Sequence, residues 1–536
     1  MSLAAPTRGR WWLAAALSVL AGAAVALAFQ PFGWLPGPLG YALLMGLWDR
    51  VAPARPMRSA FWRGWLAGTA FFLISTWWVA EAFYVDAAEQ GWMAPIAVAL
   101  LASGLGLFWG AAGALYAFAR PGGIGRPIVF AACFCLLEWL RGHVLTGFPW
   151  DLAGETWKAG SAPSQAAALV GAYGLSWITV AIAATPALLW TRRPRRADAV
   201  AAGVALAALA GLYAFGLIRL AHPVADAPNA PWVRVVQANV DQASKYDETL
   251  FRSILDRYVT LTASPAAHVP DIVIWPEGAI PDSVNDYLAP DTWTRAAITE
   301  ALKPGQTLLL GGYRFVGLGD HPKAYNSLLA FRAEPGGHGL KDLTQTAVYD
   351  KYRLVPFGEY LPAEWLLAPT GFKKLVHVTD GFDAGPPPRP ITPQGLPPVQ
   401  PLICYESLFP GFVRQGAKAA GRPAWIVNIS NDAWFGKTSG PWQHLNIASY
   451  RAIEEGLPLV RATPTGISAV IDAYGRVRPG ARLGQGAFGV IDARLPPALP
   501  PTPFSRWGEI FFWGLMTLSA AIARYVRMSR DALATV

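Results

Sequence analysis

The chain of 536 residues has few cysteines, few histidines and little charge. Cys133 and Cys135 share an apolar run and Cys404 is distant, so a disulfide framework and a CxxC metal or redox motif are excluded. The seven histidines are scattered, and we therefore expect no metal site and no cofactor. Charged residues make up 15% of the chain, against roughly 25% in soluble proteins, which excludes a disordered or simple cytosolic protein.

The chain is instead rich in long apolar runs, which lie before residue 220 and after residue 504. A helix of about 20 apolar residues crosses the hydrocarbon core of a membrane, so these runs predict a membrane protein with a polar insert. The second run is short, and Pro36 and Pro38 would kink it or make it re-entrant. We expect eight spans, at 11–29, 34–49, 60–83, 92–118, 127–149, 164–190, 198–219 and 507–526.

The charges between these runs predict their orientation. Arginines precede the first run and follow every even-numbered one, whereas the loops after the third and fifth runs are acidic or mixed. Cytoplasmic loops carry the excess of Lys and Arg, which explains the net charge of +9 without a nucleic-acid partner. We therefore expect a bacterial inner-membrane protein with a seven-span domain at 1–219, a periplasmic domain at 220–504, and a last span and cytoplasmic tail at 505–536.

The fifth run contains two opposite charges, Glu138 and Arg141, three residues apart on one helical face. At this spacing the two side chains can pair instead of facing lipid singly. Either they form a structural ion pair or they contact a lipid headgroup.

The insert has a different pattern from Pro231 onward, with short β-rich runs between helical or loop segments. Runs such as DIVIW and PLIC are almost continuously apolar, which is typical of strands in a sheet covered on both faces. We therefore expect 220–504 to form one layered α/β or α+β domain with a large core.

Three residues near the ends of such runs carry side chains suited to acyl chemistry. Glu277 follows DIVIW, Lys351 lies in VYDKYRLVPFGEY, and Cys404 ends PLIC. A thiol that attacks an acyl carbon needs a base and a positive donor for the oxyanion, which a carboxylate and an ammonium supply. Spacing alone leaves open a core cysteine, a turn glutamate and a surface lysine.

The motifs around these residues resemble a known family. WPEGAI, DKYRLVPFGEY and ICYES are similar to the Glu, Lys and Cys motifs of the nitrilase, or carbon-nitrogen hydrolase, superfamily, whose fold is an α-β-β-α sandwich. With SNDAWFG (430–436), RAIEEGLPLVRATPTGISAVID (451–472), GFPWDLAG (147–154) and an insert between seven spans and one, the chain closely resembles the apolipoprotein N-acyltransferase family. This resemblance implies a polytopic α-helical membrane domain of about eight spans plus a nitrilase-like α/β domain.

The resemblance also implies roles for the three residues. Cys404 would be the nucleophile, Glu277 the general base and Lys351 the cation that stabilises the oxyanion. An acyl chain would pass from a phospholipid to Cys404 as a thioester. The α-amino group of an apolipoprotein's N-terminal diacylglyceryl-cysteine would then take it in a ping-pong reaction.

Further residues match the family site less directly. Glu359 and Glu406 match polar positions and either take part in the chemistry or hold Lys351 in place. Tyr405 matches a position beside the nucleophile, and Tyr246 stands where the family commonly carries Trp.

Two apolar segments, AEWLLAPTGF (363–372) and DAWFGKTSGPW (432–442), either form a mobile lid that touches the bilayer or pack into the core. The residues expected to contact the acyl chains are Trp365, Trp434, Phe435 and Trp442.

Two alternatives to the transferase remain. A membrane-tethered amidase would use the same triad, with water in place of the amine. A transporter or receptor with an inactive outer domain is disfavoured because all three triad residues are present and few charges lie within the spans.

Overall fold

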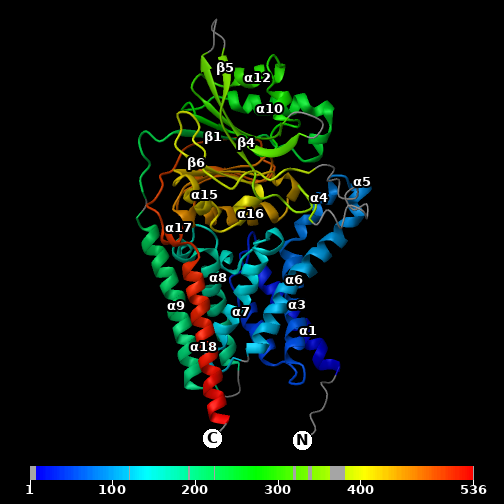
Figure 1. The fold of residues 1–536 in the computed structure, drawn as a ribbon, viewed down its shortest axis with the longest axis vertical. Coiled ribbons are helices and arrows are strands. Elements are labelled where there is room, and N and C mark those ends of the chain that lie inside the picture. The colour runs from blue at the N-terminus through cyan, green and yellow to red at the C-terminus, as the bar shows by residue number, and fades with distance from the viewer. Residues whose placement is uncertain are drawn as a thin grey trace. The chain divides into compact units, whose positions relative to one another are not determined.

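The computed structural model describes residues 8–119, 121–190, 194–222, 224–317, 322–335, 341–362 and 381–534. The chain forms two compact units (Figure 1). The helical unit contains the chain up to Ala80, Trp92–His222 and the chain from Arg506. The sandwich unit contains Glu81–Gly91 and Pro223–Ser505 and holds both β-sheets.

The helical unit has one main helix for each expected apolar run. Among the described residues, four helical stretches are long and apolar enough to cross a membrane, or five if the pair Pro56–Ser75 and Trp77–Tyr84, bent by 60°, counts as one span. This number is smaller than the eight expected. The main helices are α1 (Arg8–Ala26), α2 (Leu39–Asp49), α3 (Pro56–Ser75), α6 (Ala94–Ala119), α7 (Arg126–Arg141), α8 (Ala167–Ala184), α9 (Arg196–Leu220) and α18 (Ile510–Ala534).

The second run departs furthest from a full span. Its helix, α2, begins only after Pro38 and has 11 residues. At a rise of 1.5 Å per residue it covers about half of a hydrocarbon core roughly 30 Å thick. The prolines therefore shorten this element, as their ring geometry leads one to expect.

Helix α7 contains the predicted pair of opposite charges. Arg141 and Glu138 form a salt bridge, and both side chains are buried. The indole nitrogen of Trp109 also donates to Glu138, at 3.1 Å. Since protein groups satisfy both charges, the structure favours the ion pair over the headgroup contact.

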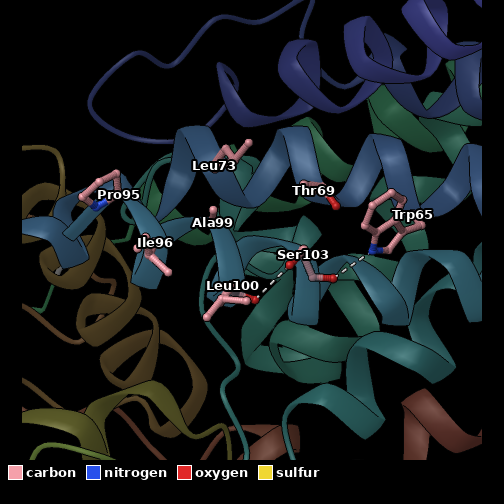
Figure 2. Close-up of a pocket in the computed structure, with 8 residues that line it drawn as sticks. All are labelled: Trp65, Thr69, Leu73, Pro95, Ile96, Ala99, Leu100 and Ser103. Atoms are coloured by element: carbon pink, nitrogen blue, oxygen red, sulfur yellow. Dashed lines mark hydrogen bonds between the residues drawn. The ribbon is translucent and has the colours of Figure 1, made fainter. Parts of the chain in front are cut away.

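A hollow of 570 Å³ lies between α3 and α6 in the helical unit (Figure 2). The indole nitrogen of Trp65 donates to the backbone oxygen of Ser103 at its edge, at 3.0 Å. No ionisable side chain lines this hollow, so it is not a candidate site for acid–base chemistry. Its lining residues are Trp65, Thr69, Leu73, Pro95, Ile96, Ala99, Leu100 and Ser103.

The sandwich unit contains two mixed sheets. In the first, β1, β2 and β3 are parallel, β4 and β5 continue it antiparallel, and β11 pairs antiparallel with β1. Its strands are β1 (Trp232–Gln237), β2 (Ile272–Ile274), β3 (Thr307–Val316), β4 (Lys323–Pro335), β5 (Lys341–Asp350) and β11 (Gly489–Arg494).

The second sheet repeats this arrangement with five strands. Strands β6, β7 and β8 are parallel, and β9 and β10 continue the sheet antiparallel. They are β6 (Val399–Ile403), β7 (Trp425–Ile429), β8 (Leu459–Ala462), β9 (Ser468–Ile471) and β10 (Val477–Leu483).

Alternating side chains explain how the layers pack. Val233 and Ile272 point into a core shared with Val427 of the second sheet. Val236 and Val273 point the other way and pack with α10 (Phe251–Ala263) and α12 (Trp293–Ala301). Helices α15 (Phe412–Ala420) and α16 (Gly440–Glu455) lie on the second sheet (Figure 1), which confirms the predicted α-β-β-α sandwich.

Candidate active site

The three residues singled out from the sequence all follow strands of the sandwich. Glu277 comes shortly after β2, Lys351 directly after β5, and Cys404 directly after β6. Asn431, just beyond β7, donates its backbone N–H to Oε2 of Glu277 at 2.6 Å. This bond joins the carboxyl ends of β2 and β7, which belong to different sheets, so both sheets build one site.

Lys351 is paired with two carboxylates. Its Nζ lies 3.1 Å from Oε1 of Glu277 and 2.8 Å from Oε1 of Glu359. The Lys351 side chain is 1% exposed, and the two carboxylates are 8% and 11% exposed. The buried ammonium therefore has the counter-charges that burial requires.

Asn326 bridges the same two carboxylates. Its Nδ2 donates to Oε1 of Glu277 at 2.7 Å and to Oε1 of Glu359 at 2.8 Å. Its backbone oxygen accepts from the N–H of Lys351 at 2.8 Å. The sequence analysis missed this residue. The available signal was an amide in a strand, a residue type that strands disfavour.

The surroundings keep the pair ionised. Burial alone would raise the pKa of Glu277, but the charge of Lys351 and hydrogen bonds from Asn326 and Asn431 outweigh it and lower that pKa. Burial would lower the pKa of Lys351, but Glu277 and Glu359 outweigh it and raise that pKa. At neutral pH the site therefore contains a carboxylate that can accept a proton and a fixed positive charge.

Cys404 adopts an uncommon backbone conformation. Its φ is +48°, in the left-handed region, where β6 gives way to the 3₁₀ turn Cys404–Leu408. Such conformations cost of order 1–3 kcal/mol and cluster at functional sites. As a residue Cys404 is partly exposed, unlike Cys133 and Cys135, and it packs against the core between the two sheets. The turn thus places the thiol at the edge of this core.

The thiol itself is not activated in the resting site. Burial and the negative charge of Glu277 raise the pKa of Cys404, and Lys351 only partly counters them. The thiol therefore stays protonated at neutral pH and needs a base before it can act as a nucleophile. An ionised carboxylate and an ammonium beside a thiol form a set that can carry out acyl transfer.

Glu406 connects the cysteine turn to the lysine segment. Its Oε2 accepts from the N–H of Ile403, and its Oε1 accepts from the N–H of Tyr352 and the hydroxyl of Tyr349, each at 2.8 or 2.9 Å. Tyr349 and Tyr352 lie on either side of Lys351 in the chain, and Ile403 directly precedes Cys404. Burial raises the pKa of this fully buried carboxyl to about 7.

The other predicted residues have different surroundings. Tyr405 is buried, with its ring 5.3 Å from that of Phe409. Tyr246 is 66% exposed, and its hydroxyl accepts from Gln242. Trp365 lies outside the described residues.

The segment 432–442 is more regular than a loop. Asp432–Phe435 forms a 3₁₀ turn, and Trp442 lies in the first turn of α16. The side chains of Trp434, Phe435 and Trp442 are partly buried. The guanidinium of Arg482 lies 5.5 Å from the ring of Trp442.

His444 belongs to a buried network behind Cys404, and its place there was missed from the sequence. Nε2 of His444 lies 3.3 Å from the backbone oxygen of Cys404 and 2.9 Å from Oγ of Ser407. Its Nδ1 lies 3.1 Å from Oδ1 of Asp432, which Arg461 holds in a salt bridge of 2.7 Å. The spacing of His444 from Cys404 in the sequence gave no indication of this contact.

Comparisons with known proteins match both units. Residues 21–185 match the model of the apolipoprotein N-acyltransferase N-terminal domain, and residues 232–499 match that of carbon-nitrogen hydrolase. The apolipoprotein N-acyltransferase of Caulobacter vibrioides is 55% identical over 98% of this chain and 96% of its own. That of Allorhizobium ampelinum is 37% identical over 97% of each chain. A solved amidase from Nesterenkonia sp. AN1 is 17% identical, with a TM-score of 0.32, over 50% of this chain and 93% of the amidase.

Proposed function

The chain belongs to the apolipoprotein N-acyltransferase family and is therefore a membrane acyltransferase that acts on lipoproteins. From this we propose that the acyl group is transferred through a thioester on Cys404. The observation that carries this proposal is the buried pair of Glu277 and Lys351 beside a thiol in a left-handed turn. In this proposal Glu277 is the base, Lys351 stabilises the oxyanion and Cys404 is the nucleophile.

The first step transfers the acyl group to the enzyme. Glu277 takes the thiol proton, and the sulfur attacks an ester carbonyl of a phospholipid. Lys351 stabilises the oxyanion that forms. The carbon–oxygen bond then breaks, Glu277 returns its proton to the departing oxygen, and a lysophospholipid leaves. A carboxylate offers about four lone-pair sites, and three are occupied at Glu277 by Asn326, Lys351 and Asn431, which leaves one for the proton.

The second step releases the acyl group to the lipoprotein. The α-amino group of the N-terminal diacylglyceryl-cysteine attacks the thioester, and Glu277 takes a proton from the amine. The carbon–sulfur bond breaks, an amide forms, and the thiolate at Cys404 regains the proton from Glu277. Glu406 holds the lysine segment to the cysteine turn through both steps, and Glu359 shares the charge of Lys351.

Intact-protein mass spectrometry tests the proposal. The purified full chain is incubated with phospholipid, and a diacylglyceryl-cysteine peptide is added afterwards. A fatty-acyl adduct should form on the native chain and on the Cys133→Ser control but not on Cys404→Ser, and it should move to the peptide amine. An adduct that water alone removes would support the amidase instead, and no adduct would overturn the thioester.

We also propose that the chain crosses the inner membrane eight times, with the sandwich unit in the periplasm. The arginine pattern between the apolar runs supports this orientation. A membrane-impermeant maleimide should label Lys303→Cys in the sandwich unit of intact spheroplasts, but not Ala54→Cys in the loop after the second run. Labelling of Ala54→Cys alone would reverse the topology.

The aromatic segments are proposed to contact the bilayer and guide acyl chains. Trp434, Phe435 and Trp442 support this because they are only partly buried. Replacing Trp365 and Trp442 by alanine should lower the transfer rate and the binding to liposomes. Trp293→Ala, which changes a tryptophan of α12 that is 48% exposed, is the matched control. Unchanged binding and transfer in the double variant would exclude a lid.

A further inference from the structure

A second buried lysine lies beside the proposed base, and no carboxylate of the described residues forms an ion pair with it. Lys245 is in the 3₁₀ turn Ala243–Tyr246, in the segment that follows β1, and is 8% exposed. Its Nζ donates to Oδ1 of Asn431 at 3.3 Å, and no carboxylate of the described chain lies within ion-pair distance of it. This differs from Lys351, which has two carboxylates.

The position of the ammonium follows from its neighbours. Asn431, which accepts from Lys245, also donates its backbone N–H to Glu277. A Cβ placed on Gly278 would lie 3.4 Å from Nζ of Lys245, so the ammonium lies next to the residue that follows the base. Lys245 therefore belongs to the same site as Glu277, on the side formed by the segment after β1.

The bonding of this ammonium is incomplete. A lysine has three N–H donors, and a neutral amide oxygen at 3.3 Å occupies one of them. Burying a cation without a counter-ion is costly, so such a group normally pairs or loses its proton. Burial does lower the pKa of Lys245, to about 8, while Glu277 and Asp241 raise it. The side chain thus remains mostly charged at neutral pH, with two donors available for an anion.

We propose that Lys245 binds the phosphate diester of the acyl donor while the donor's ester carbonyl lies at Cys404. This inference rests on the proposed function, because it takes a phospholipid as the donor. The phosphate and the ester of a glycerophospholipid are carried on the same three-carbon unit, so a lipid whose ester reaches Cys404 brings one negative charge to the neighbourhood of Glu277. Lys245 would distinguish this donor from a neutral glyceride and would gain the counter-charge that it lacks.

The test compares two donors with the same acyl chains in mixed micelles. One is a phospholipid, and the other is the diacylglycerol that lacks the phosphate. The rate of acyl-adduct formation on Cys404 is measured for each donor by mass spectrometry. The readout is the rate with the phospholipid divided by the rate with the diacylglycerol. The full-length native chain, Lys245→Met, Lys245→Arg and the exposed-lysine control Lys418→Met are compared.

We expect the native chain and Lys418→Met to favour the phospholipid. The ratio should fall at least tenfold in Lys245→Met and be partly retained in Lys245→Arg, which keeps the charge. Slower acylation by both donors with an unchanged ratio in Lys245→Met would overturn the inference, because Lys245 would then act only through Glu277. If Lys245→Met fails to fold, judged by its melting temperature, Lys245→Gln replaces it.

Two further outcomes separate the possible failures. The native chain could also acylate Cys404 equally fast with both donors and be inhibited by inorganic phosphate. This result would show that Lys245 binds free phosphate, and it would overturn the contact with the lipid. The absence of any adduct on the native chain with either donor would overturn the proposed thioester and, with it, this inference.

Discussion

The amide nitrogen of Asn326 lies 2.7 Å from Oε1 of Glu277. The same nitrogen donates to Glu359, so a single neutral side chain contacts both carboxylates that surround Lys351. Because hydrogen bonds to an ionised carboxylate stabilise its charged form, Asn326 helps to keep Glu277 ready to accept a proton without adding a charge of its own.

Asn326→Asp should therefore impair acylation more than Asn326→Ala. The aspartate replaces a donor by a third negative charge, which raises the pKa of Glu277 and draws Lys351 away from the oxyanion. We expect the rate of adduct formation on Cys404 to fall by about tenfold in Asn326→Ala, because the hydrogen bond to Glu277, of about 1.4 kcal/mol, is lost, and to fall further in Asn326→Asp. Equal rates in the two variants would show that the amide contributes only packing.

The raised pKa of Cys404 predicts its reactivity toward iodoacetamide. In the native chain the alkylation rate at Cys404 should keep rising with pH beyond pH 9, because the thiol is still protonated there. Glu277→Gln removes a negative charge that raises this pKa, so it should increase alkylation at pH 9 several-fold while it abolishes acyl transfer. Peptide mass spectrometry separates Cys404 from Cys133 and Cys135. Slower alkylation of Glu277→Gln at pH 9 would contradict this electrostatic coupling.

Glu406 predicts a pH dependence of stability. Its pKa in the folded chain is about 7, raised mainly by burial, whereas an unfolded glutamate titrates near 4.3. The folded chain therefore binds the proton more tightly, and this stabilising contribution is complete below about pH 4 and lost as the pH rises to about 7. This contribution to the free energy of unfolding is on the order of 3 kcal/mol.

Thermal unfolding of the purified chain measures this contribution. Between pH 4.5 and 7.5 the melting temperature of the native chain should fall relative to that of Glu406→Gln, which cannot ionise. The offset between the two chains at a single pH also includes the hydrogen bonds that glutamine cannot accept, so only the change in offset with pH counts. A constant offset across this range would refute the raised pKa.

The sequence located the sandwich and the strand ends that carry Glu277 and Cys404, because apolar strands and the polar residues at their ends leave a local signal. DIVIW before Glu277 and PLIC before Cys404 both formed the expected strands. Asn326 could not be found in this way, because it reaches Lys351 only through the register of β4 with β5, in which Ser327 faces Asp350. This alignment of the two strands is not specified by the local pattern of either strand.

Helix limits were also less predictable than apolar runs. Hydropathy identified the segment at 34–49, but the helix begins only at Leu39. It likewise identified 60–83, where the chain bends by 60° between Ser75 and Trp77. Hydropathy measures the preference for an apolar environment, whereas the length and direction of a helix depend on proline positions and tertiary packing. Trp442 illustrates the same limit, since the segment 432–442, predicted as a lid or as part of the core, contains the first turn of a helix.

His444 is predicted to position Cys404 through the backbone. Its Nε2 faces the backbone oxygen of Cys404, and its Nδ1 faces Asp432, which Arg461 anchors. A glutamine places its amide near the position of Nε2, and an asparagine places its amide near that of Nδ1. His444→Gln should thus keep a donor for Cys404, whereas His444→Asn should lose it and form the adduct about tenfold more slowly than His444→Gln. Both variants remove the buried ring, so their melting temperatures should be similar and serve as the control. Equal adduct rates in the two variants would show that His444 stabilises the fold without orienting Cys404.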